Sequence, residues 1–188
     1  MILIKTKSDL RLFLREDMKV NNITKKNYLF RLLFRAENAC VVSYLRSLRH
    51  EEYHYNNRQG SFYHRLLYFY FKWRTARKAY KYNIGIGINT AGYGLRIAHL
   101  RGGVILNASH IGNYVIVNTG VLTGYKGSHE CRPEIGDNVE LGAGCKVIGK
   151  VHIGNNSMVA PNAVVVHDVP DNAIVGGIPA KIIKYKEV

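Results

Sequence analysis

The sequence predicts a parallel β-helix preceded by a helical domain, mainly because a six-residue period runs from Ile111 to about Pro170. Aliphatic residues fill one position of each unit: Ile111, Val117, Ile135, Leu141, Val147, Ile153, Val159 and Val165. A period of six fits neither a helix, which repeats every 3.6 residues, nor simple strand alternation. It is typical of a hexapeptide β-helix, in which three units form one triangular coil.

The fifth position of each unit supports the same prediction, because it is small or β-branched almost throughout. Its members are Val115, Val121, Val139, Cys145, Val151, Ser157, Ala163 and Val169. We expect the first position to fill the inside of the prism and the fifth to lie where space is short. The period resumes in step after residues 124–134, so this stretch is predicted to be a loop inserted on one coil.

The chain before the repeat is predicted to be helical over residues 1–82, with Ser8-Asp9 capping a first helix. The stretch from Phe62 to Arg74 is aromatic on nearly every side, which is typical of a helix buried against another subunit. The alternative is a membrane-surface helix with its cations on lipid phosphates (Arg74, Arg77, Lys78 and Lys81). The β-helix domain is expected at 83–175 and a C-terminal tail at 176–188.

The charge is concentrated in the N-terminal part of the chain. Lys and Arg number 27 against 13 Asp and Glu, and 18 of these cations against 6 acids lie in residues 1–81. Such a surplus suits an anionic surface or is only a solvated face. No nucleic-acid-binding motif accompanies it, so nucleic acid is not an expected partner. Without a signal-peptide pattern, a long apolar run or paired cysteines, a cytoplasmic location is expected.

His99 is the candidate catalytic residue. It follows Gly92-Tyr93-Gly94-Leu95-Arg96-Ile97-Ala98 and precedes Gly102-Gly103, just ahead of the regular repeats. A neutral imidazole can accept a proton near pH 7, so a histidine among glycine-rich turns is a candidate general base.

Several motifs resemble the serine acetyltransferase branch of the hexapeptide acyltransferases. They are Gly-Tyr-Gly-Leu-x-Ile-x-His ending at His99, Pro133-Glu134-Ile135-Gly136-Asp137-Asn138-Val139, the run from Leu141 to Gly149, and Gly176-Gly177-Ile178-Pro179-Ala180-Lys181. The resemblance implies a left-handed β-helix assembled as a trimer or a dimer of trimers. It also implies an acetyl-CoA-dependent O-acetyltransferase, as in cysteine biosynthesis, in which His99 deprotonates the hydroxyl of L-serine or a similar acceptor.

The same resemblance assigns residues to acetyl-CoA, the expected cosubstrate; no metal is expected. Gly124, Ala143 and Ala160 match positions that contact the cofactor, and Lys181 and Lys184 would hold its phosphates. The family binds the pantetheine arm in the groove between neighbouring β-helices. A zinc site like that of the gamma carbonic anhydrases is not expected, because the spacing of His99, His110, His129 and His152 does not match.

The sequence departs from the serine acetyltransferase pattern around the acceptor. Ala98 replaces the acid that precedes the catalytic histidine, and Arg132 stands one residue away from the position of the family's carboxylate-binding arginine. No acid lies between Lys81 and Glu130 to orient the histidine, so Asn89 or a backbone carbonyl is expected to do so. A sugar O-acetyltransferase of capsular or exopolysaccharide biosynthesis therefore stays open. The non-enzymatic alternative is a trimeric β-helix scaffold.

Overall fold

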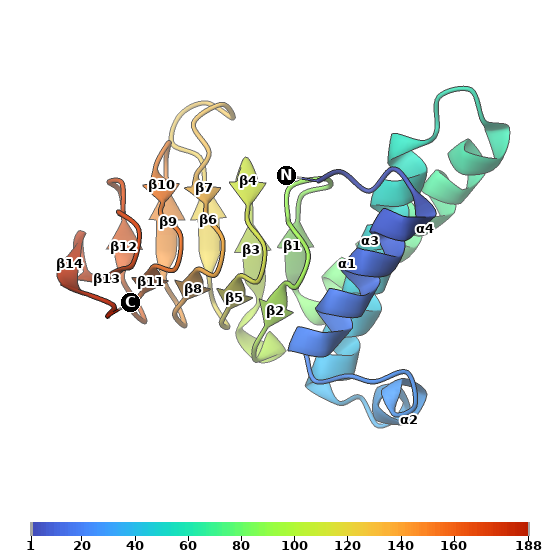
Figure 1. The fold of residues 1–188 in the computed structure, drawn as a ribbon, viewed down its shortest axis with the longest axis horizontal. Helices are drawn as coiled ribbons and strands as arrows, with labels where there is room; N and C mark the ends of the chain where they lie inside the picture. The colour runs from blue at the N-terminus through green and yellow to red at the C-terminus, as the bar shows by residue number, and fades with distance from the viewer. Residues whose placement is uncertain (1, 188) are drawn as a thin grey trace.

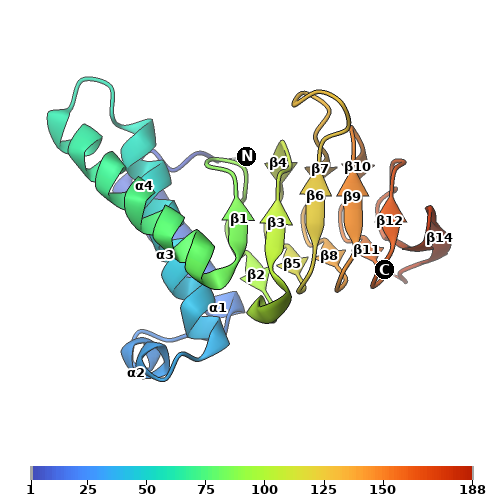
Figure 2. The same ribbon diagram turned by 180° about the vertical axis from the view of Figure 1, so that it is seen from behind.

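The computed structural model describes residues 2–187 and places four helices ahead of a column of short strands (Figure 1). The helices are α1 (Lys7–Val20), α2 (Tyr28–Leu33), α3 (Glu37–Asn56) and α4 (Phe62–Tyr82), and a 3-10 turn, η1, spans Leu100–Gly102. Helices α3 and α4 pack along each other, as Figure 2 shows from behind. Within the described residues, no helix is both long and apolar enough to cross a membrane.

The cap of α1 differs from the prediction that Ser8-Asp9 begins this helix. Thr6 is the N-cap: its hydroxyl accepts a hydrogen bond from the Asp9 backbone N–H at 3.1 Å. The Asp9 carboxylate accepts the Thr6 backbone N–H at 2.8 Å in return. Two N–H groups at the helix start are thereby satisfied reciprocally, so the helix begins at Lys7, ahead of the expected residues.

The strands that follow are two to six residues long. They are β1 (Ile84–Ile86), β2 (Arg96–Ile97), β3 (Val104–Leu106), β4 (His110–Ile111), β5 (Ile116–Val117), β6 (Leu122–Gly124), β7 (Glu134–Ile135), β8 (Glu140–Leu141), β9 (Lys146–Ile148), β10 (His152–Ile153), β11 (Met158–Val159), β12 (Val164–Val165), β13 (Ala173–Gly177) and β14 (Ala180–Tyr185).

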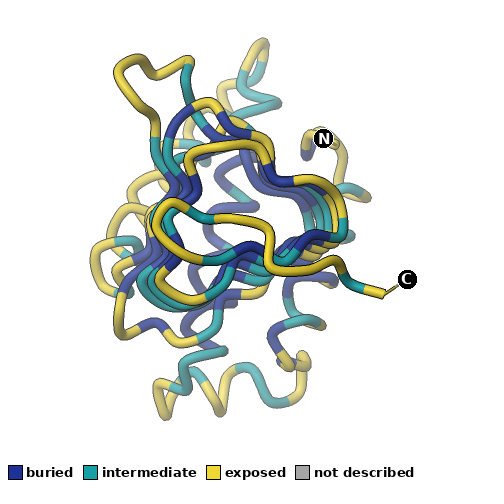
Figure 3. Tube along the Cα trace, turned by 90° about the vertical axis from the view of Figure 1, so that its left-hand side faces the viewer, coloured by how far each residue is buried: buried dark blue, intermediate teal, exposed yellow. Residues whose placement is uncertain are grey.

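These strands form three sheets that are the faces of a triangular prism. Sheet A has the order β1-β3-β6-β9-β12, sheet B the order β10-β7-β4, and sheet C the order β14-β13-β11-β8-β5-β2. All pairs are parallel except β13 with β14. Each coil contributes to each face in turn, and Figure 3, viewed from the β14 end, shows the coils stacked in one triangular outline. The predicted fold class, a left-handed parallel β-helix with an N-terminal helical domain, is confirmed.

The interior of the prism confirms the roles expected of the repeat. Every residue named above for the first position has an exposed fraction of 1% or less, and the fifth-position residues are buried as well. The same apolar cluster continues into α3 through Val41, Leu45 and Leu48. Helix α3 therefore closes the N-terminal end of the prism, where an uncovered coil would otherwise expose its apolar interior.

The inserted loop and the C-terminal segment are the two places where the chain departs from the regular coils. Residues 125–133 form the inserted loop, which extends beyond the coils between β6 and β7 in Figure 1. Gly124 and Glu134, expected within the loop, are the last residue of β6 and the first of β7. Residues 176–188, expected as a tail, include the end of β13 and strand β14, which pairs antiparallel with β13 along the edge of sheet C.

Thr123 fills a core position of the prism without a hydrogen bond for its hydroxyl. It lies six residues after Val117, is 1% exposed, and its Oγ1 has no partner among the described atoms. We expect Thr123→Val to raise the free energy of unfolding by about 1 kcal/mol, because valine has the same shape and no buried polar group to desolvate. Chemical denaturation of the two proteins measures the difference; a destabilised variant would show that the hydroxyl has a partner in solution.

Candidate functional site

His99 lies on the corner between sheets C and A, immediately after β2 and before η1. Its backbone has φ +62°, and its side chain is 76% exposed. A left-handed conformation is unfavourable for a residue with a Cβ and persists only where the surroundings hold it. Two contacts fix the corner: Ala98 N–H donates to the Val117 carbonyl at 2.8 Å, and Gly102 N–H donates to the Thr119 hydroxyl at 2.8 Å.

A carboxylate from the helical domain faces this histidine. Glu37, in the first turn of α3, places Oε2 at 3.7 Å from His99 Nδ1 and Oε1 at 3.6 Å from Arg101 Nε. Sequence reasoning sought an acid near His99 in the chain and missed Glu37, because helix packing brings it from 62 residues away. No sequence signal marks it, since one glutamate at a helix start is also a common helix-stabilising choice.

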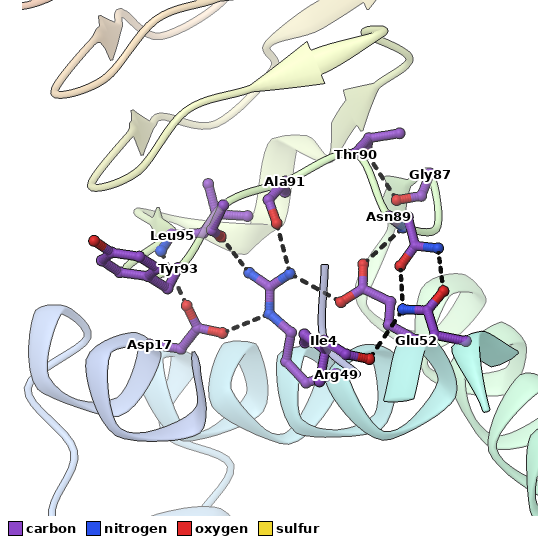
Figure 4. Close-up of polar contacts among 12 residues, drawn as sticks. Ile4, Asp17, Arg49, Glu52, Gly87, Asn89, Thr90, Ala91, Tyr93 and Leu95 are labelled. Carbon is purple, nitrogen blue, oxygen red and sulfur yellow. Dashed lines mark hydrogen bonds and ion pairs between the residues drawn. The ribbon is translucent and has the colours of Figure 1, made fainter. Parts of the chain in front are cut away.

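The first coil is held from below by Arg49 of α3, which is fully buried (Figure 4). Its guanidinium pairs with Asp17 of α1 at 2.9 Å and with Glu52 at 3.1 Å. It also donates to the carbonyls of Ala91 at 2.9 Å and Gly92 at 2.6 Å. Since the planar guanidinium carries five donors, it can serve two carboxylates and two carbonyls together.

Both carboxylates in turn hold the backbone that leads to His99. Asp17 accepts the Leu95 N–H at 3.1 Å, and Glu52 accepts the Asn89 N–H at 2.9 Å. Burial raises the pKa of the Glu52 carboxyl, and the positive charge of Arg49 opposes that rise. Arg49, Asp17 and Glu52 thus bind the segment 89–95 at four backbone groups, and Asn21 donates to a fifth, the Leu95 carbonyl, at 2.9 Å. Strand β2 and His99 follow directly.

Asn89 does not occupy the place expected of it. It lies on the corner between sheets A and B, and its amide exchanges hydrogen bonds with the Asn56 amide at 2.8 and 3.1 Å. His99 lies on the corner between sheets C and A, so within one chain Asn89 does not orient the imidazole. Glu37 is the carboxylate that the structure places beside His99.

Three of the residues assigned to the cofactor share the corner of His99. Ala143 follows β8 and Ala160 follows β11, and these two strands pair with each other in sheet C, one coil apart. Both alanines therefore lie on the corner of His99. Lys181 of β14 pairs with Gly176 at the last coil, and Lys184 lies further along the same strand. Sheet C advances by five strands from β2 to β14, so this line is about 24 Å long at ~4.8 Å per strand.

Gly124 and Arg132 lie elsewhere. They stand at the two ends of the inserted loop, on the corner between sheets A and B. The Nε of Arg132 is buried and has no hydrogen-bond partner within residues 2–187. Figure 1 shows the loop and the turn between β2 and β3 on opposite sides of the prism. One chain therefore does not bring the expected substrate-binding arginine to His99.

The six-residue repeat of the prism has a match among known families. The bacterial transferase hexapeptide (six repeats) family matches residues 132–167. The expected resemblance to serine acetyltransferases is confirmed by curated relatives. The chain is 40% identical to the Mycobacterium tuberculosis serine acetyltransferase over 46% of this chain and 39% of the relative. It is 36% identical to the Bacillus subtilis serine acetyltransferase over 61% of this chain and 55% of the relative.

Solved structures agree on the fold. The soybean serine acetyltransferase apoenzyme aligns with a TM-score of 0.70 at 25% identity, over 94% of this chain and 70% of that one. The Brucella abortus serine acetyltransferase in complex with coenzyme A aligns with a TM-score of 0.65 at 22% identity, over 96% of this chain and 70% of that one. The chain spans about two fifths to just over half the length of the two curated relatives described above.

The Arg49 cluster predicts a large loss of stability when the cation is removed. We expect Arg49→Met to lower the free energy of unfolding by about 3–5 kcal/mol, because Asp17 and Glu52 are left as buried charges without their partner. The matched control is Arg15→Met, which removes a 2.8 Å pair with Glu16 whose arginine is 71% exposed; a loss under about 1 kcal/mol is expected there. Equal losses in the two variants, measured by denaturation, would contradict a structural role for the buried cluster.

Proposed function

We propose that this protein is an acetyl-CoA-dependent O-acetyltransferase of the serine acetyltransferase type, with His99 as the general base. The observation that carries the proposal is the corner that joins His99, Ala143, Ala160 and Lys181 in one line. An extended thioester cofactor laid along this line would have its phosphates near Lys181 and Lys184 and its acyl end near His99. The curated relatives described above are named serine acetyltransferases, which supports the same activity.

The reaction would proceed by direct transfer. His99 takes the proton of the acceptor hydroxyl, and the oxygen attacks the thioester carbonyl carbon. The tetrahedral oxyanion is stabilised by backbone N–H groups of the glycine-rich corner. When it collapses, the C–S bond breaks, and the leaving thiolate takes the proton from the imidazolium. Because Nδ1 faces Glu37, Nε2 is the nitrogen left to act as the base.

We propose that the complete site forms between two copies of the chain, within a trimer or a dimer of trimers. Arg132 and Gly124 lie on a different corner of the prism from His99. Only the β-helix of a neighbouring copy could bring residues of that corner close to His99, Ala143 and Ala160. The guanidinium of Arg132 is suited to an anionic group of an acceptor, and its Nε has no hydrogen-bond partner within residues 2–187. We place the reaction in the cytoplasm, where acetyl-CoA is made and used.

The acceptor is proposed to be L-serine or a similar small hydroxyl compound. The second candidate is a sugar hydroxyl, and Ala98 favours it, because a methyl side chain beside His99 provides no charge for an amino-acid ammonium group. Both acceptors would use His99 as the base and the same residues to bind the cofactor. They differ only in the groups that hold the rest of the acceptor.

Thiol release from acetyl-CoA tests the proposal with L-serine, hexoses and N-acetylhexosamines as acceptors. We expect acceptor-dependent release that His99→Ala lowers by at least ~100-fold, since the variant lacks the base. The control is His50→Gln, on helix α3 and away from both corners, which should retain activity. Near-normal turnover in His99→Ala would contradict the mechanism. Absence of release with every acceptor, together with no binding of coenzyme A in calorimetry, would favour a non-catalytic scaffold.

Glu37 is proposed to position the imidazole of His99. We expect Glu37→Gln to lower kcat about 10-fold while the KM for acetyl-CoA stays unchanged, because the charge that favours one tautomer and orientation is lost. Glu16→Gln is the control, since Glu16 of α1 pairs with Arg15 at 2.8 Å, away from the corner of His99 and from the inserted loop. An unchanged kcat in Glu37→Gln, or an equal loss in Glu16→Gln, would contradict this role.

A further inference from the structure

Helix α4 has two apolar faces, and only one of them is covered within the chain. The inner face packs on α3: Phe71 stacks on the His54 ring at 5.5 Å, Thr75 is buried, and Lys78 Nζ donates to the Ser43 carbonyl at 2.6 Å. The opposite face is open to solvent (Figure 2). The inner contacts satisfy the packing of α4 on its own domain, so the outer face needs a separate explanation.

The outer face carries a stripe of large apolar side chains along its length. Phe62, Leu66, Phe69, Trp73 and Tyr80 follow each other at intervals of four, three, four and seven residues. At 100° per residue these positions lie on one side of a helix. Their exposed fractions run from 56% at Trp73 to 92% at Tyr80. Aromatic side chains in a row with this exposure are typical of a surface that meets another apolar phase or partner.

Cations border this stripe on both sides. By the same helical geometry, Arg65 and Lys72 lie along one edge, and Arg77 and Lys81 lie along the other. Arg77 lies over the Trp73 ring at 4.9 Å, so its charge sits at the rim of the apolar stripe. The sequence contains no Asp or Glu between Glu52 and Glu130, so α4 itself carries no acid. Glu51 of α3 lies near Lys72, but it is buried and does not belong to the exposed face.

We propose that α4 is a membrane-surface helix that docks this stripe into the interface of a bilayer containing anionic lipids. An interfacial helix combines an apolar stripe with flanking Lys and Arg, which keep their charged ends at the phosphates while their stems cover apolar surface. Each such cation near an anionic leaflet adds to the attraction. The β-helix at the far end of the chain would stay in water.

The charge decides against a second copy of this chain as the occupant. Two α4 helices placed stripe to stripe would bring their bordering cations together, with no acid in the segment to pair with them. Like charges at close range oppose such a contact, whereas lipid phosphates neutralise both edges at once. This inference does not depend on the proposed acetyl transfer, since its test needs neither an acceptor nor the cofactor.

Trp73 provides a direct test, because it is the only tryptophan of the chain and lies in the stripe. The full-length protein is mixed with vesicles of phosphatidylcholine alone or of phosphatidylcholine with phosphatidylglycerol. We expect a blue shift of tryptophan emission and co-sedimentation only with the anionic vesicles, and their loss at high salt, where surface attraction is screened.

Two variants separate the parts of the surface, and a third is the control. Phe69→Ser removes part of the stripe, and the double variant Lys72→Gln/Arg77→Gln removes a cation from each edge. Each is expected to weaken partition to the anionic vesicles at least ~10-fold while the helical circular dichroism is kept. Arg11→Gln/Lys19→Gln removes the same charge from exposed positions on α1 and should leave partition unchanged.

Three results would overturn the proposal. The first is no shift with anionic vesicles. The second is equal loss of partition in the α1 control, which would mean that only net charge matters. The third is emission that is already blue-shifted in buffer and depends on protein concentration, with self-association seen by sedimentation equilibrium, which would identify a second copy as the occupant.

Discussion

The buried guanidinium of Arg49 is the interaction on which the rest of this structure depends. It joins α1, α3 and the first coil through Asp17, Glu52 and two backbone carbonyls. A β-helix needs a closed first coil, because an open end exposes both apolar side chains and unpaired strand edges. Here the helical domain closes that end with Val41, Leu45 and Leu48 and fixes its backbone with one ionic cluster. Domain and prism therefore form one continuous core.

This arrangement links the helical domain to the candidate site. The segment that Arg49, Asp17 and Glu52 hold runs directly into β2, and His99 follows in a left-handed conformation that its neighbours must maintain. Glu37 reaches the imidazole from the start of the same helix that carries Arg49. Two residues of α3, Arg49 and Glu37, thus set the position of His99. The later coils carry Ala143 and Ala160, the residues proposed for the cofactor, along the same corner.

The prism was predictable from the sequence, and the contacts between domains were not. Each hexapeptide places its own residues, so the period alone identified the buried positions from Ile111 to Val165 and the place of the inserted loop. Glu37, by contrast, acts through packing of segments far apart in the chain, which leaves no period. Asn89, expected to orient the imidazole, lies on another corner from His99 within one chain for the same reason, since Asn56 of α3 takes its amide. The cap at Thr6 was missed because Ser8 offers a similar hydroxyl two residues later.

Amide hydrogen exchange in the Arg49→Met variant tests the central claim most directly. If the cluster sets the backbone ahead of His99, the amides of Asn89 and Leu95 and the residues through His99 lose protection, while the coils from β7 to β13 keep theirs. The Leu95 and Asn89 N–H groups are the useful probes, because they donate to Asp17 and Glu52. Unchanged protection of both amides in a variant that lacks the cation would contradict the account.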